Sequence, residues 1–271
     1  MKSTNPADYQ HTQRPIAAMP KNFPAGSYIP PHTHRRAQLA WAEDGVMTVT
    51  AAEEGTWVVP PNRALFIPAG TVHSIRMSRA VAMRALYIEP RLARTVATTC
   101  KVILMTGLLR ELVLEAAHAP LDDNKNGRMR HVEALILDEI RTLRAQPLHL
   151  PMPRDKRLRT VCEALLRKPG REETLEQWSD MAGASSRTLA RLFAGETGMS
   201  FVDWRQQAQL SAALVQLAEG ARVASVARTL GYASVSAFTA MFRKALGKTP
   251  RDYLFQGYGD STNLLTTGEE R

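Results

Sequence analysis

The chain has 271 residues, a formal net charge of +9, 44% hydrophobic residues and 6% aromatic residues. This length suits two domains of ordinary size. No apolar run is long enough for a membrane span, and the polar first residues exclude a secretory signal, so we expect a cytoplasmic protein without a membrane partner.

The positive charge favours a polyanionic partner, but charge alone does not separate nucleic acid from an acidic membrane surface. The excess of Lys and Arg is spread over both halves of the chain, so evidence for DNA binding has to come from sequence pattern. Cys100 and Cys162 are the two cysteines. In a reducing compartment both are predicted to be free thiols.

Residues 16–90 are expected to form a small β-barrel. Short runs rich in β-branched and aromatic residues, such as VMTVT, TWVV, ALFI and HSIRM, alternate with turns that contain Gly and Pro. Its core is expected to contain four large aromatic side chains: Trp41, Trp57, Phe66 and Tyr87.

Residues 91–146 show helical periodicity and are expected to form a helical hairpin, interrupted by the polar segment 122–127. One apolar stripe consists of Val102, Met105, Leu109, Leu112 and Val113, and the other of Val132, Leu135, Ile136, Ile140 and Leu143. An apolar stripe has to be buried, but the sequence does not show which surface covers it. Packing on the barrel and packing on a second subunit, as a homodimer, are equally supported.

A linker is expected at residues 147–154, where three prolines prevent helix formation. Residues 155–254 then form an all-helical domain, and residues 255–271 a flexible polar tail. The expected fold class is multidomain α+β: a β-barrel with a helical hairpin, followed by an all-α domain.

The helical domain contains an internal repeat. An offset of 49 positions superimposes the segment that starts at Ser185 on the segment that starts at Ser234, and Leu189, Phe193 and Gly198 then fall on equivalent residue types. Each unit has a helix, a Gly-containing turn, a hydroxyl residue suited to N-capping and a second helix. This is the pattern of two helix-turn-helix units.

The second helix of each unit is expected to enter a DNA major groove. The reading face of the first unit comprises Ser186, Arg187, Ala190 and Arg191, and that of the second Val235, Ser236, Thr239 and Ala240, with Arg243 and Lys244 further along. Because Arg binds guanine through two hydrogen bonds, the first unit is expected to read bases. The second is expected to contact phosphates and thymine methyl groups.

Residues 155–254 resemble the DNA-binding domain of AraC/XylS-type transcription regulators, most clearly in the phrase GYASVSAFTAMFRKALGKTPRDY. The resemblance implies seven helices and a connecting helix at Phe201 to Ala218, so that both reading helices meet successive major grooves. It implies base contacts from Arg187, Ala190, Arg191, Ser236 and Thr239.

The barrel segment resembles the cupin superfamily in its two motifs, GSYIPPHTHRRAQLAWAEDG and PAGTVH. By position, the resemblance implies a metal or effector site made of His32, His34, Gln38 and His73. Imidazoles bind divalent transition metals well. Gln38 stands where the family usually has Glu, so a metal-free pocket, whose histidines bind an effector or one another, is the alternative.

Three functions are consistent with these features. The first is a transcription factor that binds promoter DNA and, in its barrel, a small-molecule effector, with RNA polymerase as a further partner. The second is a cupin metalloenzyme with an appended DNA-binding domain. The third is a constitutive DNA-binding regulator whose barrel is purely structural. We expect the first, a regulator and not an enzyme.

Overall fold

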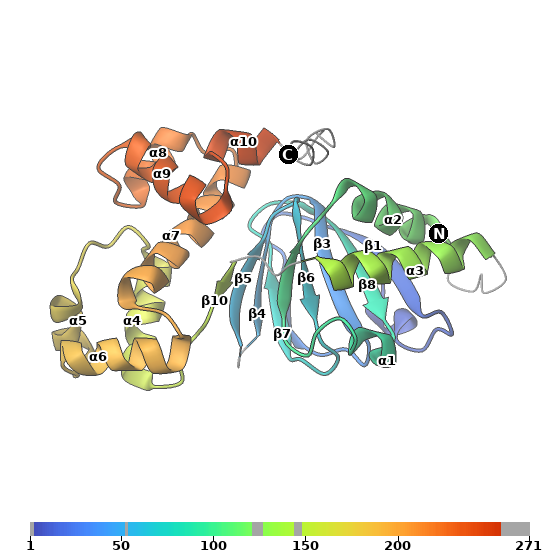
Figure 1. The fold of residues 1–271 in the computed structure, drawn as a ribbon, viewed down its shortest axis with the longest axis horizontal. Helices are drawn as coiled ribbons and strands as arrows, with labels where there is room; N and C mark the ends of the chain where they lie inside the picture. The colour runs from blue at the N-terminus through green and yellow to red at the C-terminus, as the bar shows by residue number, and fades with distance from the viewer. Residues whose placement is uncertain (1–2, 52–53, 121–126, 144–147, 256–271) are drawn as a thin grey trace, which may run out of the picture.

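The computed structural model describes residues 3–51, 54–120, 127–143 and 148–255. The expected tail at 255–271 therefore lies almost wholly outside the described residues, as does most of the polar break at 122–127. Figure 1 shows a β-rich N-terminal half beside an all-helical C-terminal half. Among the described residues no helix is long and apolar enough to cross a membrane.

The N-terminal half contains two antiparallel five-stranded sheets, ordered β1-β8-β3-β6-β9 and β10-β5-β4-β7-β2. The strands are β1 (Ile16–Phe23), β2 (Tyr28–His32), β3 (Ala37–Asp44), β4 (Met47–Ala51), β5 (Gly55–Val59), β6 (Arg63–Ile67), β7 (His73–Arg76), β8 (Val81–Ile88), β9 (Lys101–Leu104) and β10 (His149–Leu150). Two short helical segments accompany these strands: η1 (Pro6–Tyr9) precedes β1, and α1 (Pro90–Ala93) lies between β8 and β9. The β-barrel expected from the sequence is thus present.

Alternate residues of the first sheet belong to two different cores. In β1, Ala17 and Met19 pack in the barrel interior, whereas Ile16 and Ala18 pack beneath the helices outside it. This follows from the period of two in a strand. All four expected core aromatics are buried; Trp57 and Tyr87 join the interior cluster, and Trp41 and Phe66 the outer one.

The outer core is covered by α2 (Gly107–His118) and α3 (Gly127–Thr142), which lie across the sheet in Figure 1. Three residues of the expected helical stripes do not fit them: Val102, Met105, which lies between β9 and α2, and Leu135. Val102 lies in β9, where it faces the interior while Ile103 faces the helices, so this segment follows a strand period and α2 starts only at Gly107. Leu135 is 46% exposed because its neighbour Ile136 takes the inward position.

The connector between the halves is part of the second sheet. In β10, which forms the edge of this sheet, His149 and Leu150 pair with Trp57 and Thr56 of β5. Gly55 makes this approach feasible: its φ is +129°, and a Cβ atom there would lie 2.4 Å from the Leu150 carbonyl oxygen. The linker is therefore held by backbone hydrogen bonds.

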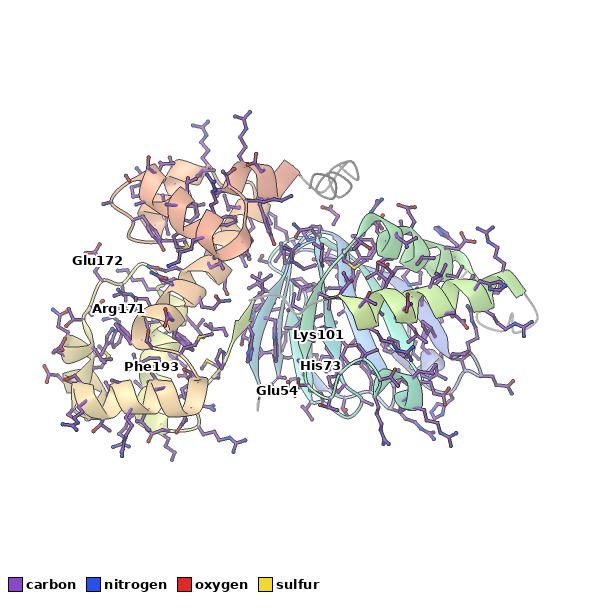
Figure 2. The ribbon with its side chains drawn as sticks, in the orientation of Figure 1. Glu54, His73, Lys101, Arg171, Glu172 and Phe193 are labelled. Carbon is purple, nitrogen blue, oxygen red and sulfur yellow. The ribbon has the colours of Figure 1, made fainter. Side chains whose placement is uncertain are left out.

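The C-terminal half contains seven α-helices within its described residues, the number implied by the resemblance. They are α4 (Lys156–Arg167), α5 (Leu175–Ala182), α6 (Ser186–Leu192), α7 (Phe201–Ala218), α8 (Val223–Thr229), α9 (Val235–Leu246) and α10 (Pro250–Phe255), with a π turn η2 (Phe193–Thr197) after α6. The connecting helix α7 has the bounds expected from the sequence. Phe193, labelled in Figure 2, fills the centre of the first helical unit.

The two halves touch beyond the linker. Apolar residues of α7, including Leu210 and Leu214, belong to the same cluster as the barrel interior. The buried guanidinium of Arg63 lies over the ring of Tyr253, 5.5 Å from its centroid. Cys100 and Cys162 are free, as expected.

Gly55→Ala should destabilise the protein by about 3 kcal/mol, because it adds both backbone strain and a clash with the linker. Gly70→Ala is a matched control: its φ is also positive (+82°), but a Cβ there meets nothing within 4 Å. The control should cost only about 1 kcal/mol. Equal losses of unfolding free energy in urea would contradict a role for Gly55 in linker pairing.

Candidate functional site

The first reading helix, α6, presents the expected side chains to solvent. Ser185 caps the helix by accepting a hydrogen bond from the Thr188 amide at 3.2 Å. Arg187, Ala190 and Arg191 are exposed, and Ser186 is half-buried. On the opposite side, Leu189 is buried in the core of the first unit. The predicted face is thus free to meet a ligand.

The second reading helix, α9, has the same construction. Ser234 accepts a hydrogen bond from the Ala237 amide at 3.1 Å, and Phe238 and Phe242 are buried. The exposed residues on the predicted face are Val235, Ser236, Ala240, Arg243 and Lys244, and Thr239 is half-buried. This face is apolar and hydroxyl-bearing in its first two turns and basic only in its last turn.

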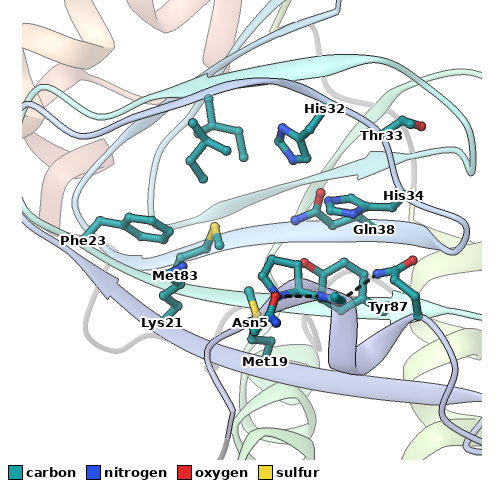
Figure 3. A pocket seen from close by; sticks show the side chains of 15 residues that line it. Asn5, Met19, Lys21, Phe23, His32, Thr33, His34, Gln38, Met83 and Tyr87 are labelled. Carbon is teal, nitrogen blue, oxygen red and sulfur yellow. Dashed lines mark hydrogen bonds between the residues drawn. The ribbon is translucent and has the colours of Figure 1, made fainter.

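A cavity of about 510 Å³ opens in the barrel interior (Figure 3). Its lining combines apolar and polar side chains, namely Asn5, Pro6, Ala7, Gln10, Met19, Lys21, Phe23, Ile29, His32, Thr33, His34, Gln38, Ile75, Met83 and Tyr87. Three of the four site residues expected from the cupin resemblance are among them. His73 contacts the other two histidines directly.

The three histidines converge from different elements. His32 ends β2 and pairs with His73 at the start of β7, and their ring centroids are 4.3 Å apart. His34 follows β2, with its centroid 4.8 Å from that of His32. One nitrogen from each ring lies within 4.8 Å of the other two. Gln38 reaches the histidines from the other sheet, because β2 ends at His32 and Gln38 lies in β3.

Hydrogen bonds to carbonyl groups fix the tautomers of two of these rings. Nδ1 of His32 donates to the Pro30 carbonyl at 2.8 Å, and Nδ1 of His73 donates to the Thr71 carbonyl at 2.9 Å. When neutral, each ring therefore carries its lone pair on Nε2. Burial lowers the pKa of His73 to about 4, which keeps it neutral near pH 7.

His34 and Gln38 complete the polar end of the cavity. His34 is 9% exposed, its Nε2 has no hydrogen-bond partner among the described residues, and burial beside the other two histidines lowers its pKa to about 4. The Gln38 amide lies 3.1 Å from Nε2 of His73. Since the two ends of a Gln amide are interchangeable, Gln38 can donate its NH₂ to that nitrogen.

Most of the apolar lining was missed at the sequence level. Met19, Lys21 and Phe23 alternate along β1, and Met83 and Tyr87 lie on β8, which pairs with β1. The period of two in these strands marks their inward faces, but it does not distinguish a cavity wall from a filled core. Tyr87, expected as core, is both buried and part of the wall.

The segment before β1 covers part of the cavity. Asn5, Pro6, Ala7 and Gln10 belong to the lining, and the ring of Tyr9 lies 5.7 Å from that of Tyr87. No sequence pattern indicated this contribution, because the segment is polar and has no periodicity.

Both halves of the chain are similar to known protein families. A family model described as an AraC-like ligand binding domain matches residues 20–177, and one described as a helix-turn-helix domain matches residues 178–256. The HTH-type transcriptional regulator NimR of Escherichia coli is 40% identical over 225 residues, which cover 83% of this chain and 82% of NimR.

Two further similarities are more limited. The HTH-type transcriptional regulator RipA of Corynebacterium glutamicum is 34% identical over 103 residues, covering 38% of this chain and 31% of RipA. The structure of ToxT from Vibrio cholerae aligns with a TM-score of 0.40 at 10% identity, over 91% of this chain and all of that one.

The lowered pKa values of His34 and His73 predict an acid-labile barrel. Both values drop from 6.5 to about 4 on folding, so the fold favours the neutral rings. The stabilisation is complete above pH 6.5 and is lost as the pH falls towards 4. With EDTA present, the melting temperature should fall by about 4 °C or more between pH 7.5 and pH 5.

A double variant with His34→Gln and His73→Gln should show a flatter pH profile. Replacing the exposed His131 with Gln is the matched control and should leave the profile of the natural protein unchanged. Identical slopes in all three proteins would contradict the assignment.

Proposed function

Because this chain belongs to the AraC family of helix-turn-helix transcriptional regulators, we propose that an effector bound among its barrel histidines alters how α6 and α9 meet promoter DNA. The observation that carries the proposal is the combination of two capped, exposed reading helices with a lined cavity in the attached barrel.

The two reading helices differ in their chemistry. Arg187 and Arg191 of α6 can each form paired hydrogen bonds with guanine, which is the commonest base-specific contact in the major groove. The first turns of α9 offer Ser236 and the half-buried Thr239, which suit a phosphate oxygen or a thymine methyl group. Sequence preference should therefore come mainly from α6.

Arg191→Ala should reduce affinity for the selected DNA site about tenfold or more and relax preference at one base position, because a paired guanine contact is worth about 1–3 kcal/mol. Titrations of labelled duplexes at constant salt measure this. Arg79→Ala, which removes an exposed Arg from a barrel turn, is the matched control for charge.

If Arg191→Ala weakened all sequences equally, Arg191 would be a phosphate contact. If it changed neither affinity nor preference, the assigned reading face would be wrong.

The cavity is proposed to bind a largely apolar small molecule. Met19, Phe23 and Met83 supply apolar surface on one side, and the imidazoles and Gln38 supply a few polar contacts at the other end. This is the usual composition of a small-molecule site. The relatives are transcriptional regulators, which favours a sensing role for this cavity over a catalytic one.

The three histidines also fit a divalent transition metal. The carbonyl bonds of His32 and His73 are the outer interactions typical of imidazole ligands, since they leave Nε2 available. The unpartnered Nε2 of His34 adds a third donor. A bound ion would supply a Lewis-acidic contact for an effector. Because the Gln38 amide lies 3.1 Å from Nε2 of His73, an ion bound at that nitrogen would replace this hydrogen bond.

Protein incubated with Zn²⁺ and then dialysed should retain about one ion per chain, measured by elemental mass spectrometry. His34→Ala should lose it, and the matched variant His131→Ala should not. If all three proteins retained zinc, the ion would be bound outside the histidine cluster. Absence from the natural protein would instead support a metal-free cavity in which the imidazoles bind the effector directly.

A second copy of the chain is the proposed partner of the hairpin α2–α3. Leu108 and Leu135 are 52% and 46% exposed. The Thr106 hydroxyl donates to the Glu139 carboxylate at 2.7 Å, which places the start of α2 beside the C-terminal end of α3. A symmetric contact would cover both leucines. RNA polymerase is the proposed partner through which DNA-bound protein changes transcription.

A further inference from the structure

The loop between α4 and α5, residues 168–174, contacts both helix-turn-helix units. It belongs to the first unit by sequence, yet it reaches the turn between α8 and α9 in the second unit. In Figure 2, Arg171 and Glu172 of this loop lie between the two groups of helices.

The contact is between main chains. A Cβ atom on Gly170 would lie 2.2 Å from the Thr229 carbonyl oxygen and 3.1 Å from the Leu230 carbonyl carbon. Neither neighbour is a flexible side chain, so no larger residue fits without moving one unit relative to the other. The approach is also close from the second unit, since a Cβ on Gly231 would lie 2.9 Å from the Gly170 carbonyl oxygen.

The loop is also held to its own unit. The guanidinium of Arg171 lies over the indole of Trp178 in α5, 4.4 Å from the ring centroid, and forms an ion pair with Glu173. A cation over an indole ring is favourable at this distance. Gly170 is therefore joined to α5, which packs against the reading helix α6.

The connecting helix α7 holds the same turn from another direction. Gln209 donates to the Leu230 carbonyl at 3.0 Å and accepts a hydrogen bond from the Tyr232 hydroxyl at 3.0 Å. The chain itself joins the two units through α7, and bending at its ends would change the separation of α6 and α9. With the loop, the two units and α7 form a closed set of contacts.

We propose that residues 168–174 act as a spacer that fixes the separation and angle of the two reading helices, with Gly170 as its positioning residue. This rests on the proposed function, because it concerns DNA with two half-sites. One base pair of extra spacing rotates a half-site by about one tenth of a turn. A rigid spacer should therefore make DNA affinity sensitive to the addition or removal of one base pair between the half-sites.

The test uses the full chain and a random-sequence duplex library, from which the natural protein selects a two-part site. Duplexes with one base pair added or removed between the parts are then titrated. The natural protein should lose about tenfold in affinity for either change, whereas Gly170→Ala should lose less than about threefold and should select sites of mixed spacing.

Three comparisons separate a spacer from a merely structural residue. Gly127→Ala, at the start of α3 where a Cβ meets nothing within 4 Å, should keep the natural spacing profile. Arg171→Ala removes the Trp178 contact but keeps Gly170, and should broaden spacing to a lesser degree. On a duplex whose second part is scrambled, all variants should bind within about twofold of the natural protein.

If the Gly170→Ala variant kept the spacing profile of the natural protein, the proposal would be overturned. If Gly170→Ala failed to fold, an unchanged profile for Arg171→Ala would overturn it equally. Failure of the natural protein to select any sequence would instead refute the proposed function itself, and the spacer with it.

Discussion

The backbone pairing of β10 with β5 is the constraint on which the arrangement of the molecule depends. Two residues of the connector complete an edge of the barrel sheet, which both protects that edge and sets where α4 begins. From there α7 returns to the barrel, and Arg63 reaches Tyr253 in α10. The barrel and the helical half are thus joined by packed side chains as well as by the linker.

The cavity shows how an apolar interior can contain polar chemistry. His34 and His73 stay neutral because burial disfavours their charged forms, and the carbonyl bonds of His32 and His73 satisfy their Nδ1 atoms. The unpaired nitrogen of His34 is the exception. A buried polar atom without a partner is costly, and a ligand that satisfied it would recover that free energy.

Sequence periodicity was sufficient for the architecture and for the buried and exposed sides of α6 and α9, because Leu189 and Phe238 lie at fixed helical offsets from the exposed residues. The resemblance to the cupin motifs, rather than periodicity, grouped the three histidines, which the structure brings together from β2, the residues after it and β7 of one sheet. Periodicity failed at Val102, whose spacing from Met105 suits a helix although Val102 lies in a strand. It also gave no indication of the contacts of Gly170, which depend on a turn far along the chain. Long-range approach of main chains leaves no local signal.

The unequal reading faces have a consequence for how such a regulator changes over generations. In the proposed function, the arginines of α6 supply most of the affinity for DNA, so substitutions there are expected to be costly. The small exposed side chains of Ser236 and Ala240 are expected to contribute less to affinity. New promoters could be recruited by single substitutions in α9 while the α6 half-site stayed the same. The second helix is therefore where related regulators can acquire different target genes without first losing their hold on DNA.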